Sequence, residues 1–265
     1  RLSPRFRRRP TVGVVFIFRR QPSTPIARFR QQDLQALTLQ PTARMNQFPH
    51  SITFISETVL RGPNVWTYCP VLETQVDIGS LEDFPSNRIP GFAERLSAWL
   101  PGLIEHRCSP GVRGGFLQRL DEGTWPAHIL EHVSLELLGL VGLQSGFGRA
   151  RETEKRGVYR VIISAQQETV SRLALQISRD LVLAAMADRS FDLEAAVDTL
   201  RDLAESKWLG PSTAAIATAA EERRIPMMRL NEGNLVQFGY GCQQRRIWTA
   251  ETDRTSAIAE GVSRD

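Results

Sequence analysis

The chain has 265 residues, of which 42% are hydrophobic and 23% charged, and this is the composition of a globular protein and not of a disordered or fibrous one. No apolar run approaches the roughly 18 residues that a membrane span needs, so we expect no membrane partner. Three cysteines without a CxxC pair argue against a disulfide framework and favour a reducing compartment, the cytoplasm.

Positive charge is concentrated at the N-terminus. Residues 1–49 contain ten arginines, no lysine and one acidic residue, Asp33, which gives about +9. Because the whole chain carries +4, residues 50–265 carry −5. The basic character therefore belongs to this extension, and the sequence predicts no nucleic-acid partner for the rest of the chain.

Residues 1–49 form a separate segment in the sequence, and three explanations for it stay open. It has the Arg-rich, acid-poor composition of a transit-like presequence, and it also fits a disordered basic arm. The interpretation that we favour is translated upstream DNA, with the true start at Met45, because the patterning of a folded protein begins only around Ile52.

The predicted elements of the next segment follow in chain order. Residues 52–60 alternate and are rich in β-branched side chains, which predicts a strand, and RGPN at 61–64 predicts a turn before a second strand region at 65–79. A helix follows at 91–103, then a Gly- and Pro-rich loop. Thr124 is the expected N-cap of an apolar helix over 126–140, with Pro126 in its first turn.

A polar connection is expected at 144–157, followed by a strand at 158–165, a long amphipathic helix at 167–187 and another helix that starts after its N-cap, Asp192. The composition then changes to an Ala-rich helix and short strands with tight turns, and residues 253–265 begin a further helix. We predict an α+β fold with an N-terminal extension (1–49), a mixed helix and strand domain (50–190), and a linker helix with the start of a second lobe (191–265).

The predicted helix at 126–140 carries an unusual polar group within an apolar sequence. His128, Glu131 and His132 project within a sector of roughly 100°. HxxEH is the inverted zincin signature, in which two histidines bind Zn²⁺ and the glutamate acts as general base. We therefore predict His128 and His132 as metal ligands and Glu131 as the catalytic base. The alternative is that both histidines are satisfied core residues and Glu131 pairs with an arginine.

A catalytic zinc site needs a third protein ligand. Glu168 is our first choice, because inverted zincins take this ligand from a glutamate on a following helix; Glu152 is the second choice and His106 a weaker one. Glu136 is excluded, since it lies about 12 Å along the helix from His128. Cys108 is a poor candidate nucleophile, because no spacing pairs it with a histidine.

Two stretches are candidates for substrate binding. In CSPGVRGGF at 108–116, Arg113 could bind a carboxylate through two hydrogen bonds, and Gly114 and Gly115 would let the backbone approach a ligand closely. The alternative is a tight turn before a helix. Arg149 closes GFGR, a stretch too short to be a phosphate-binding loop, and is a further candidate.

Several motifs together resemble the cyanophycin synthetase family. They include LRGPNVW (60–66), PSNRIPGFAERL (85–96), EHRCSPGVRGGFLQRLDEGTWPAHILEHVSLEL (105–137), LGPSTAAI (209–216) and VQFGYGCQQRRIWTAETDRTSAIAE (236–260). The resemblance covers about residues 52–265 and leaves out 1–49. One departure is Val112, which stands where the family pattern suggests a second cysteine.

The resemblance implies a fragment of a cytoplasmic, homo-oligomeric ligase. Such a ligase polymerises aspartate and arginine into cyanophycin, using ATP and Mg²⁺ in an ATP-grasp domain and a Mur-ligase-like domain. This sequence would hold the N-terminal domain and an incomplete ATP-grasp α/β lobe, without the ligase sites and without bound ATP or Mg²⁺. The N-terminal domain would bind the polymer, with the alternative that its HxxEH helix is a zinc-dependent hydrolase that trims cyanophycin into primers.

Overall fold

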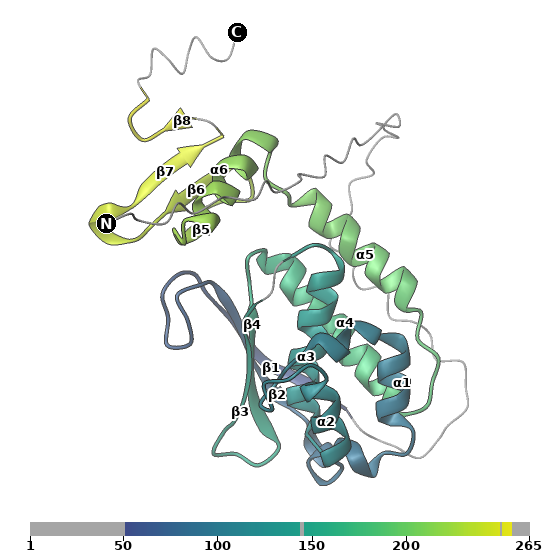
Figure 1. Ribbon diagram of the computed structural model, residues 1–265. Helices are drawn as coiled ribbons and strands as arrows, with labels where there is room; N and C mark the ends of the chain where they lie inside the picture. The colour runs from purple at the N-terminus through teal and green to yellow at the C-terminus, as the bar shows by residue number, and fades with distance from the viewer. Residues whose placement is uncertain (1–50, 144–145, 250, 256–265) are drawn as a thin grey trace, which may run out of the picture. The chain divides into compact units, whose positions relative to one another are not determined.

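The computed structural model describes residues 51–143, 146–249 and 251–255, all of which belong to one compact unit spanning 46–265. These residues form a mixed α/β structure with six α-helices and two antiparallel sheets (Figure 1). Among the described helices, none combines the length and the apolar character needed to cross a membrane. The extension at 1–49 and most of the helix expected at 253–265 lie outside the described residues.

The larger sheet has the strand order β1-β2-β4-β3, with every neighbouring pair antiparallel. The strands are β1 (Thr53–Leu60), β2 (Val71–Asp77), β3 (Gly148–Glu152) and β4 (Val158–Ser164). Strand β3 falls within the stretch expected to be a polar connection. Its sequence, GRARE, has no apolar alternation, and it is held as an edge strand by its register with β4, from Gly148 opposite Ile163 to Glu152 opposite Tyr159.

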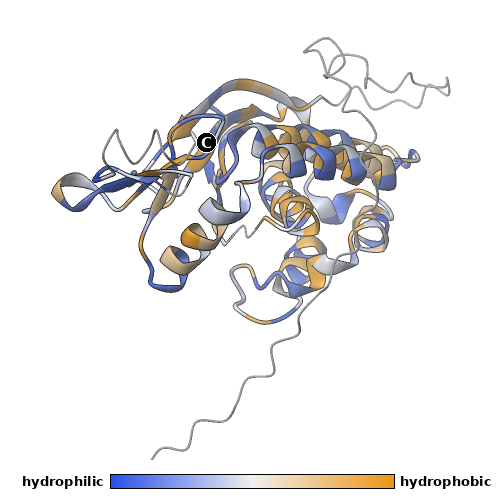
Figure 2. Ribbon diagram, turned by 90° about the horizontal axis from the view of Figure 1, so that it is seen from above, coloured by the Kyte–Doolittle hydropathy of each residue, from blue (hydrophilic) through white to orange (hydrophobic). Residues whose placement is uncertain are grey.

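Five helices accompany this sheet: α1 (Phe92–Trp99), α2 (Gly115–Glu122), α3 (Pro126–Leu140), α4 (Glu168–Met186) and α5 (Leu193–Ser206). Short 3₁₀ turns occupy Gly79–Asp83, Ser86–Arg88 and Pro101–Glu105. Helix α3 contacts β3, β4 and α4, and the helices lie on one side of the sheet (Figure 1). Apolar and polar residues alternate around the helix turns, as expected for helices with one buried face (Figure 2).

The core lies between this sheet and the helices. Every second residue of the central strands points into it, including Leu72 and Val76 of β2 and Val161 and Ile163 of β4, and none of these four side chains is exposed. Each such burial stabilises the fold by about 1.5–3 kcal/mol. The core therefore fixes α3 firmly against β3 and β4.

The two expected helix caps had different outcomes. Asp192 caps α5 as predicted, because its carboxylate accepts a hydrogen bond from the Ala195 N–H at 3.0 Å. The prediction for Thr124 was wrong: the N-cap of α3 is Trp125, and the Thr124 hydroxyl instead lies 2.8 Å from His128 Nδ1. Helix α5, assigned from the sequence to the linker, contributes Leu200 and Ala204 to the larger core.

A smaller sheet and one helix follow. They are α6 (Pro211–Glu222), β5 (Met227–Arg229), β6 (Leu235–Phe238), β7 (Arg245–Trp248) and β8 (Glu251–Thr252), with a 3₁₀ turn at Gly241–Gln243. The strands are antiparallel in sequence order, which confirms the predicted run of short strands with tight turns. Their core is small and consists of Ala220, Val236, Phe238 and Ile247.

Candidate metal centre

Helix α3 carries its polar side chains into the interior of the domain. Its Ile129, Leu130 and Val133 are fully buried, while Glu131 and His132 keep only 7% and 6% of their surface exposed. Burial of polar groups at this depth costs several kcal/mol unless each finds a partner. The partners of the HxxEH side chains therefore determine what the site can do.

His128 lies beside a cysteine from the loop before α2. Its Nε2 is 3.3 Å from Cys108 Sγ, and its Nδ1 faces Thr124 Oγ1. Ligand atoms of Cys108, His128 and His132 all lie within 4.8 Å of one another. Thiolate and imidazole ligands of a tetrahedral Zn²⁺ lie roughly 3.3–3.8 Å apart, so this set of donors fits zinc with little movement.

His132 is connected to a carboxylate through a second histidine. His132 Nδ1 lies 2.9 Å from His106 Nδ1, and His106 Nε2 lies 2.9 Å from Glu136 Oε2. When His106 is neutral, its Nε2–H donates to the Glu136 carboxylate and its Nδ1 accepts from the His132 Nδ1–H. This arrangement leaves the lone pair of His132 Nε2 free for a metal, with a carboxylate and a histidine orienting the ligand from behind.

Both histidines of the motif are held in the neutral form that binds metals. Burial, with a smaller contribution from Arg119, lowers the pKa of His128 to about 4. Burial, followed by the neighbouring His128 and His106, lowers the pKa of His132 to about 2. The Phe116 ring stacks on His132 with a centroid distance of 4.1 Å, which fixes the imidazole plane.

Glu131 points toward β3. The Ala150 backbone N–H donates a hydrogen bond to its carboxylate, and Gly148 packs so closely that a Cβ there would lie 2.6 Å from Glu131 Oε1. Burial raises the pKa of Glu131 to about 7, although the nearby Arg149 acts in the opposite direction. A carboxyl group with this pKa can exchange a proton near neutral pH, as a general base must.

A cavity of about 320 Å³ opens beside this group. Glu131 and His132 line it together with His106, Arg107, Leu135, Gly146 and Gly148. A substrate or a water molecule in this cavity would therefore reach the proposed base and one proposed ligand from the same side.

Of the three candidates for the third ligand, His106 lies beside His132, whereas the two glutamates lie elsewhere. Glu168 forms a two-pronged ion pair with Arg61, with one N–O distance of 2.9 Å, and lines a different cavity from the histidines. Glu152 is exposed at the end of β3. The structure thus brings Cys108 to His128 and His132, and does not bring Glu168 or Glu152 there.

The predicted substrate-binding residues are also separated from one another. The exposed Arg113 is paired with Glu105 at 2.7 Å, and the exposed Arg149 lies 5.9 Å above the Phe147 ring. Gly114 has a left-handed φ of +82°, and a Cβ on Gly115 would lie 1.9 Å from the Arg107 carbonyl oxygen. These glycines therefore serve a tight turn, which places Phe116 on the histidines.

Two residues of the group were missed by sequence reasoning. Cys108 precedes His128 by 20 residues, and only the turn at 111–115 brings its thiol back to the helix. Its φ of +48° is strained for a residue with a side chain, which is common at functional sites. Glu136 was excluded as a ligand to a metal shared with His128, and it acts here through His106.

The described fold and site define an α+β domain in which His128 and His132 of the central helix meet Cys108 from the loop before α2, and we call these three residues the histidine–cysteine group. Comparison with known proteins places this domain: residues 73–187 match the family model described as the cyanophycin synthase-like N-terminal domain. This part of the chain belongs to that family.

Curated relatives agree with this assignment. A cyanophycin synthetase of Synechocystis sp. (PCC 6803) is 47% identical over 195 residues, which is 71% of this chain and 22% of the relative. That of Trichormus variabilis is 42% identical over 212 residues, or 78% of this chain and 23% of the relative. That of Crocosphaera subtropica is 41% identical over 211 residues, or 78% and 24%. The chain spans under a quarter of the length of each of these three relatives.

Proposed function

We propose that this chain is the N-terminal part of a cyanophycin synthetase, a cytoplasmic, homo-oligomeric ligase that joins aspartate and arginine with ATP and Mg²⁺. The support is the identity of 41–47% to three relatives of that name. In this proposal the small sheet after residue 210 begins the ATP-grasp lobe, and the ligase sites belong to the rest of the protein. The described residues would then have a role other than ligation, and we propose two such roles, polymer binding and polymer hydrolysis.

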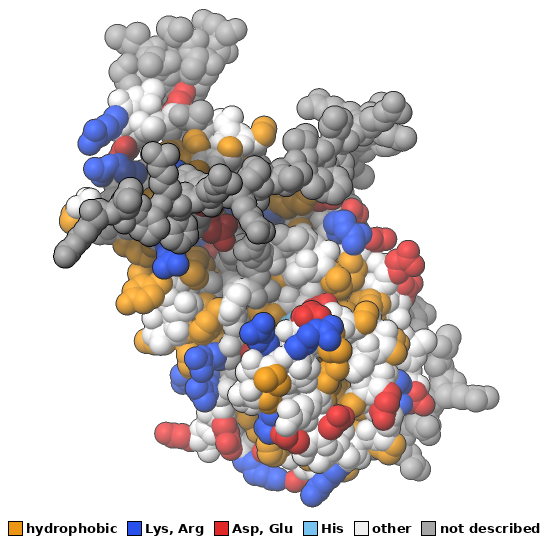
Figure 3. Space-filling view, viewed as in Figure 1, with side chains coloured by type: hydrophobic (Ala, Val, Ile, Leu, Met, Phe, Trp, Pro, Cys, Tyr) orange, Lys and Arg blue, Asp and Glu red, His pale blue; other side chains and the backbone are white. Residues whose placement is uncertain are grey.

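The first role that we propose for the domain is to bind the polymer. Cyanophycin presents arginine side chains, and carboxylates bind guanidinium groups through charge-assisted hydrogen bonds. Helix α5 offers such carboxylates: Glu194, Asp198, Asp202 and Glu205 recur at spacings of three and four residues and are all exposed. Acidic side chains are visible along this helix in Figure 3. This stripe is the observation that favours polymer binding.

Neutralising the stripe tests this role. The double variant Glu194→Gln/Asp202→Asn should bind soluble cyanophycin about three- to tenfold more weakly than the wild type at low salt, since each exposed ion pair contributes up to about 1 kcal/mol. Asp83→Asn removes an exposed carboxylate elsewhere and serves as the matched control. Equal binding by the double variant and the control, measured by biolayer interferometry, would contradict the assignment to α5.

The second role, zinc-dependent hydrolysis of the polymer, is favoured by the histidine–cysteine group. Its donors suit zinc, and we propose Cys108, His128 and His132 as the ligands, with Cys108 in the place first given to Glu168. A zinc ion held there would polarise the scissile carbonyl and make water a better nucleophile. Glu131 would take the proton from the attacking water and return it to the leaving amine.

Metal content separates the two roles. We expect close to one Zn²⁺ per chain in wild type, and loss of zinc in Cys108→Ser and His132→Asn. Glu131→Gln should keep its zinc and lose cyanophycin cleavage, because only the base is removed. Less than about 0.2 Zn²⁺ per chain in a protein that still binds the polymer would refute the hydrolase and leave the binding role intact.

A further inference from the structure

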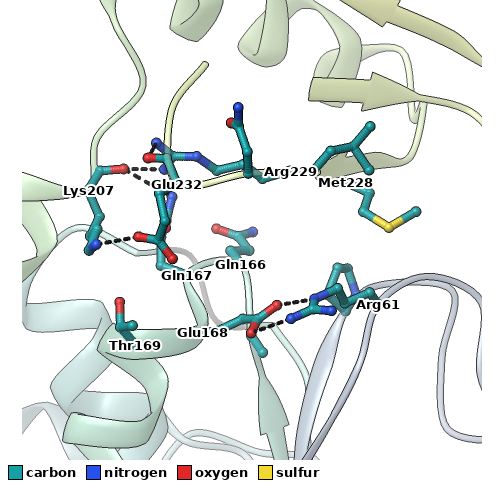
Figure 4. Close-up of a pocket in the computed structure, with 13 residues that line it drawn as sticks. Arg61, Gln166, Gln167, Glu168, Thr169, Lys207, Met228, Arg229 and Glu232 are labelled. Carbon is teal, nitrogen blue, oxygen red and sulfur yellow. Dashed lines mark hydrogen bonds and ion pairs between the residues drawn. The ribbon is translucent and has the colours of Figure 1, made fainter. Parts of the chain in front are cut away.

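A second cavity, distinct from the one beside the histidines, lies where four segments meet (Figure 4). Its walls come from the β1–β2 connection, the start of α4, the residue that follows α5, and β5 with the turn after it. Its volume is about 380 Å³, which is within the range of small-ligand sites. We call it the Arg229 cavity, and its charged lining residues are Arg61, Glu168, Lys207, Arg229 and Glu232.

The charges of this lining are unequal. Three side chains are cationic and two are acidic, so the lining carries a net charge of +1. Each carboxylate is already taken: Glu168 pairs with Arg61, and Glu232 pairs with Lys207, on opposite sides of the cavity (Figure 4). The remaining cation, Arg229, is therefore the source of the excess.

Arg229 is held in place without a carboxylate contact among the described residues. Its Nε donates to the Gly233 carbonyl at 2.6 Å, one terminal nitrogen donates to the Glu232 carbonyl at 2.8 Å, and the other donates to the Lys207 carbonyl. These acceptors are neutral, so they fix the guanidinium, and the nearby Glu232 carboxylate, which pairs with Lys207, acts on its charge only from beyond ion-pair distance. Burial lowers the Arg229 pKa, although Glu232 acts in the opposite direction, and this agrees with a cation that lacks a direct ion pair.

An anion in the cavity would remove this imbalance. It would lie against a rigidly held guanidinium, with the Lys207 ammonium nearby and the first turn of α4 on the opposite wall. We propose that the Arg229 cavity binds the anionic group of a small metabolite, a carboxylate or a phosphate, on a molecule of about amino-acid size. The site is independent of the histidine–cysteine group and of the function proposed above.

The proposal predicts opposite effects for cation and acid variants. Arg229→Gln and Lys207→Gln should each weaken binding of the anion about three- to tenfold, because each removes an attracting charge. Glu232→Gln should tighten binding by a similar factor, because it releases Lys207 and raises the net charge of the lining to +2. A merely structural role for these residues would not produce tighter binding in any variant.

The experiment is calorimetric titration of the full chain with inorganic phosphate and, separately, with succinate, in a low-salt buffer without other multivalent anions. Arg156→Gln, which removes an exposed arginine outside the cavity, is the control and should bind like the wild type. Since Arg229→Gln loses three hydrogen bonds to the backbone, Lys207→Gln and Glu232→Gln decide the outcome if that variant fails to fold.

Saturable binding of either probe, weakened by Lys207→Gln and tightened by Glu232→Gln, supports the site. The tighter-binding probe then identifies the group as phosphate or carboxylate. The proposal is overturned if neither probe saturates below about 10 mM, or if Glu232→Gln fails to tighten the binding that the wild type shows.

Discussion

Replacing Gly148 by alanine should disturb the proposed base from the strand side. A Cβ at this position would lie 2.6 Å from Glu131 Oε1, 2.7 Å from Leu135 Cδ1 and 2.8 Å from Glu131 Cγ. Separations this short cannot persist, so the carboxylate must turn away and its hydrogen bond from Ala150 must lengthen. Overpacking in a core costs about 1–3 kcal/mol, while the gain in strand propensity from Gly to Ala returns about 0.5–1 kcal/mol.

The difference between these two contributions is at most about 2.5 kcal/mol, and we expect Gly148→Ala to lower the free energy of unfolding by about 1–2 kcal/mol, the middle of that range, measured by urea titration. Gly146→Ala is the control on the same connection, because a Cβ there meets no atom within 4 Å. In a Glu131→Ala background the cost should shrink, since two of the three close contacts disappear. An unchanged free energy of unfolding in Gly148→Ala would refute the tight packing that this reasoning requires.

Three further predictions concern α3 and the turn that follows it. Burial raises the Glu131 pKa from 4.5 to about 7, so the contribution of this carboxyl group to stability is present at low pH and lost as pH rises through about 7. The free energy of unfolding of Glu131→Gln should therefore exceed that of the wild type by up to about 3 kcal/mol at pH 8 and equal it near pH 4, measured by urea titration with EDTA. Burial lowers the pKa of His128 from 6.5 to about 4 and that of His132 to about 2, so the contribution of these neutral imidazoles to stability is present above pH 6.5 and lost as pH falls toward 4. The thermal midpoint of His128→Asn should therefore depend less on pH in that range than the midpoint of the wild type does. Gly139→Ala, with open space for a Cβ, should stabilise by about 0.5 kcal/mol in thermal unfolding, whereas Gly142→Ala, at a φ of +79°, should destabilise by about 1 kcal/mol.

Elements with a strong local pattern were predictable from the sequence. The alternation of 52–60 and the helical periodicity of 167–187 gave β1 and α4 to within about a residue or two at each end. Strand β3 was missed because its residues contribute little to the core, and its pairing with β4 supplies the order that its own sequence lacks. Thr124 was misassigned because a hydroxyl before a helix can bond either the backbone or a side chain, and here it faces His128.

In the candidate site, too, the residues with a local sequence pattern were predictable and their tertiary partners were not. One helix fixes the spacing of His128, Glu131 and His132, so their shared location followed from periodicity. The partners arrive from other segments, and no local pattern specifies them. Glu168 stands on the expected helix but pairs with Arg61, whereas Cys108 reaches His128 through a turn that only the fold explains.

The polar side chains of α3 therefore each have a different neighbour, and this explains how an apolar helix tolerates them. His128 lies between Thr124 and Cys108, and Glu131 accepts a hydrogen bond from the β3 backbone. His132 is hydrogen-bonded to His106, which is in turn hydrogen-bonded to Glu136. A large hydrophobic core surrounds these side chains and positions the segments that carry them. A metal bound here would meet imidazoles that burial keeps in the neutral form, which is the form that binds metals. Ligands that the core already holds in place lose little conformational entropy when a metal binds, so the metal would bind more tightly than it would to ligands on a mobile segment. Three protein ligands would then be enough to hold the ion, and the fourth position would stay open for a substrate.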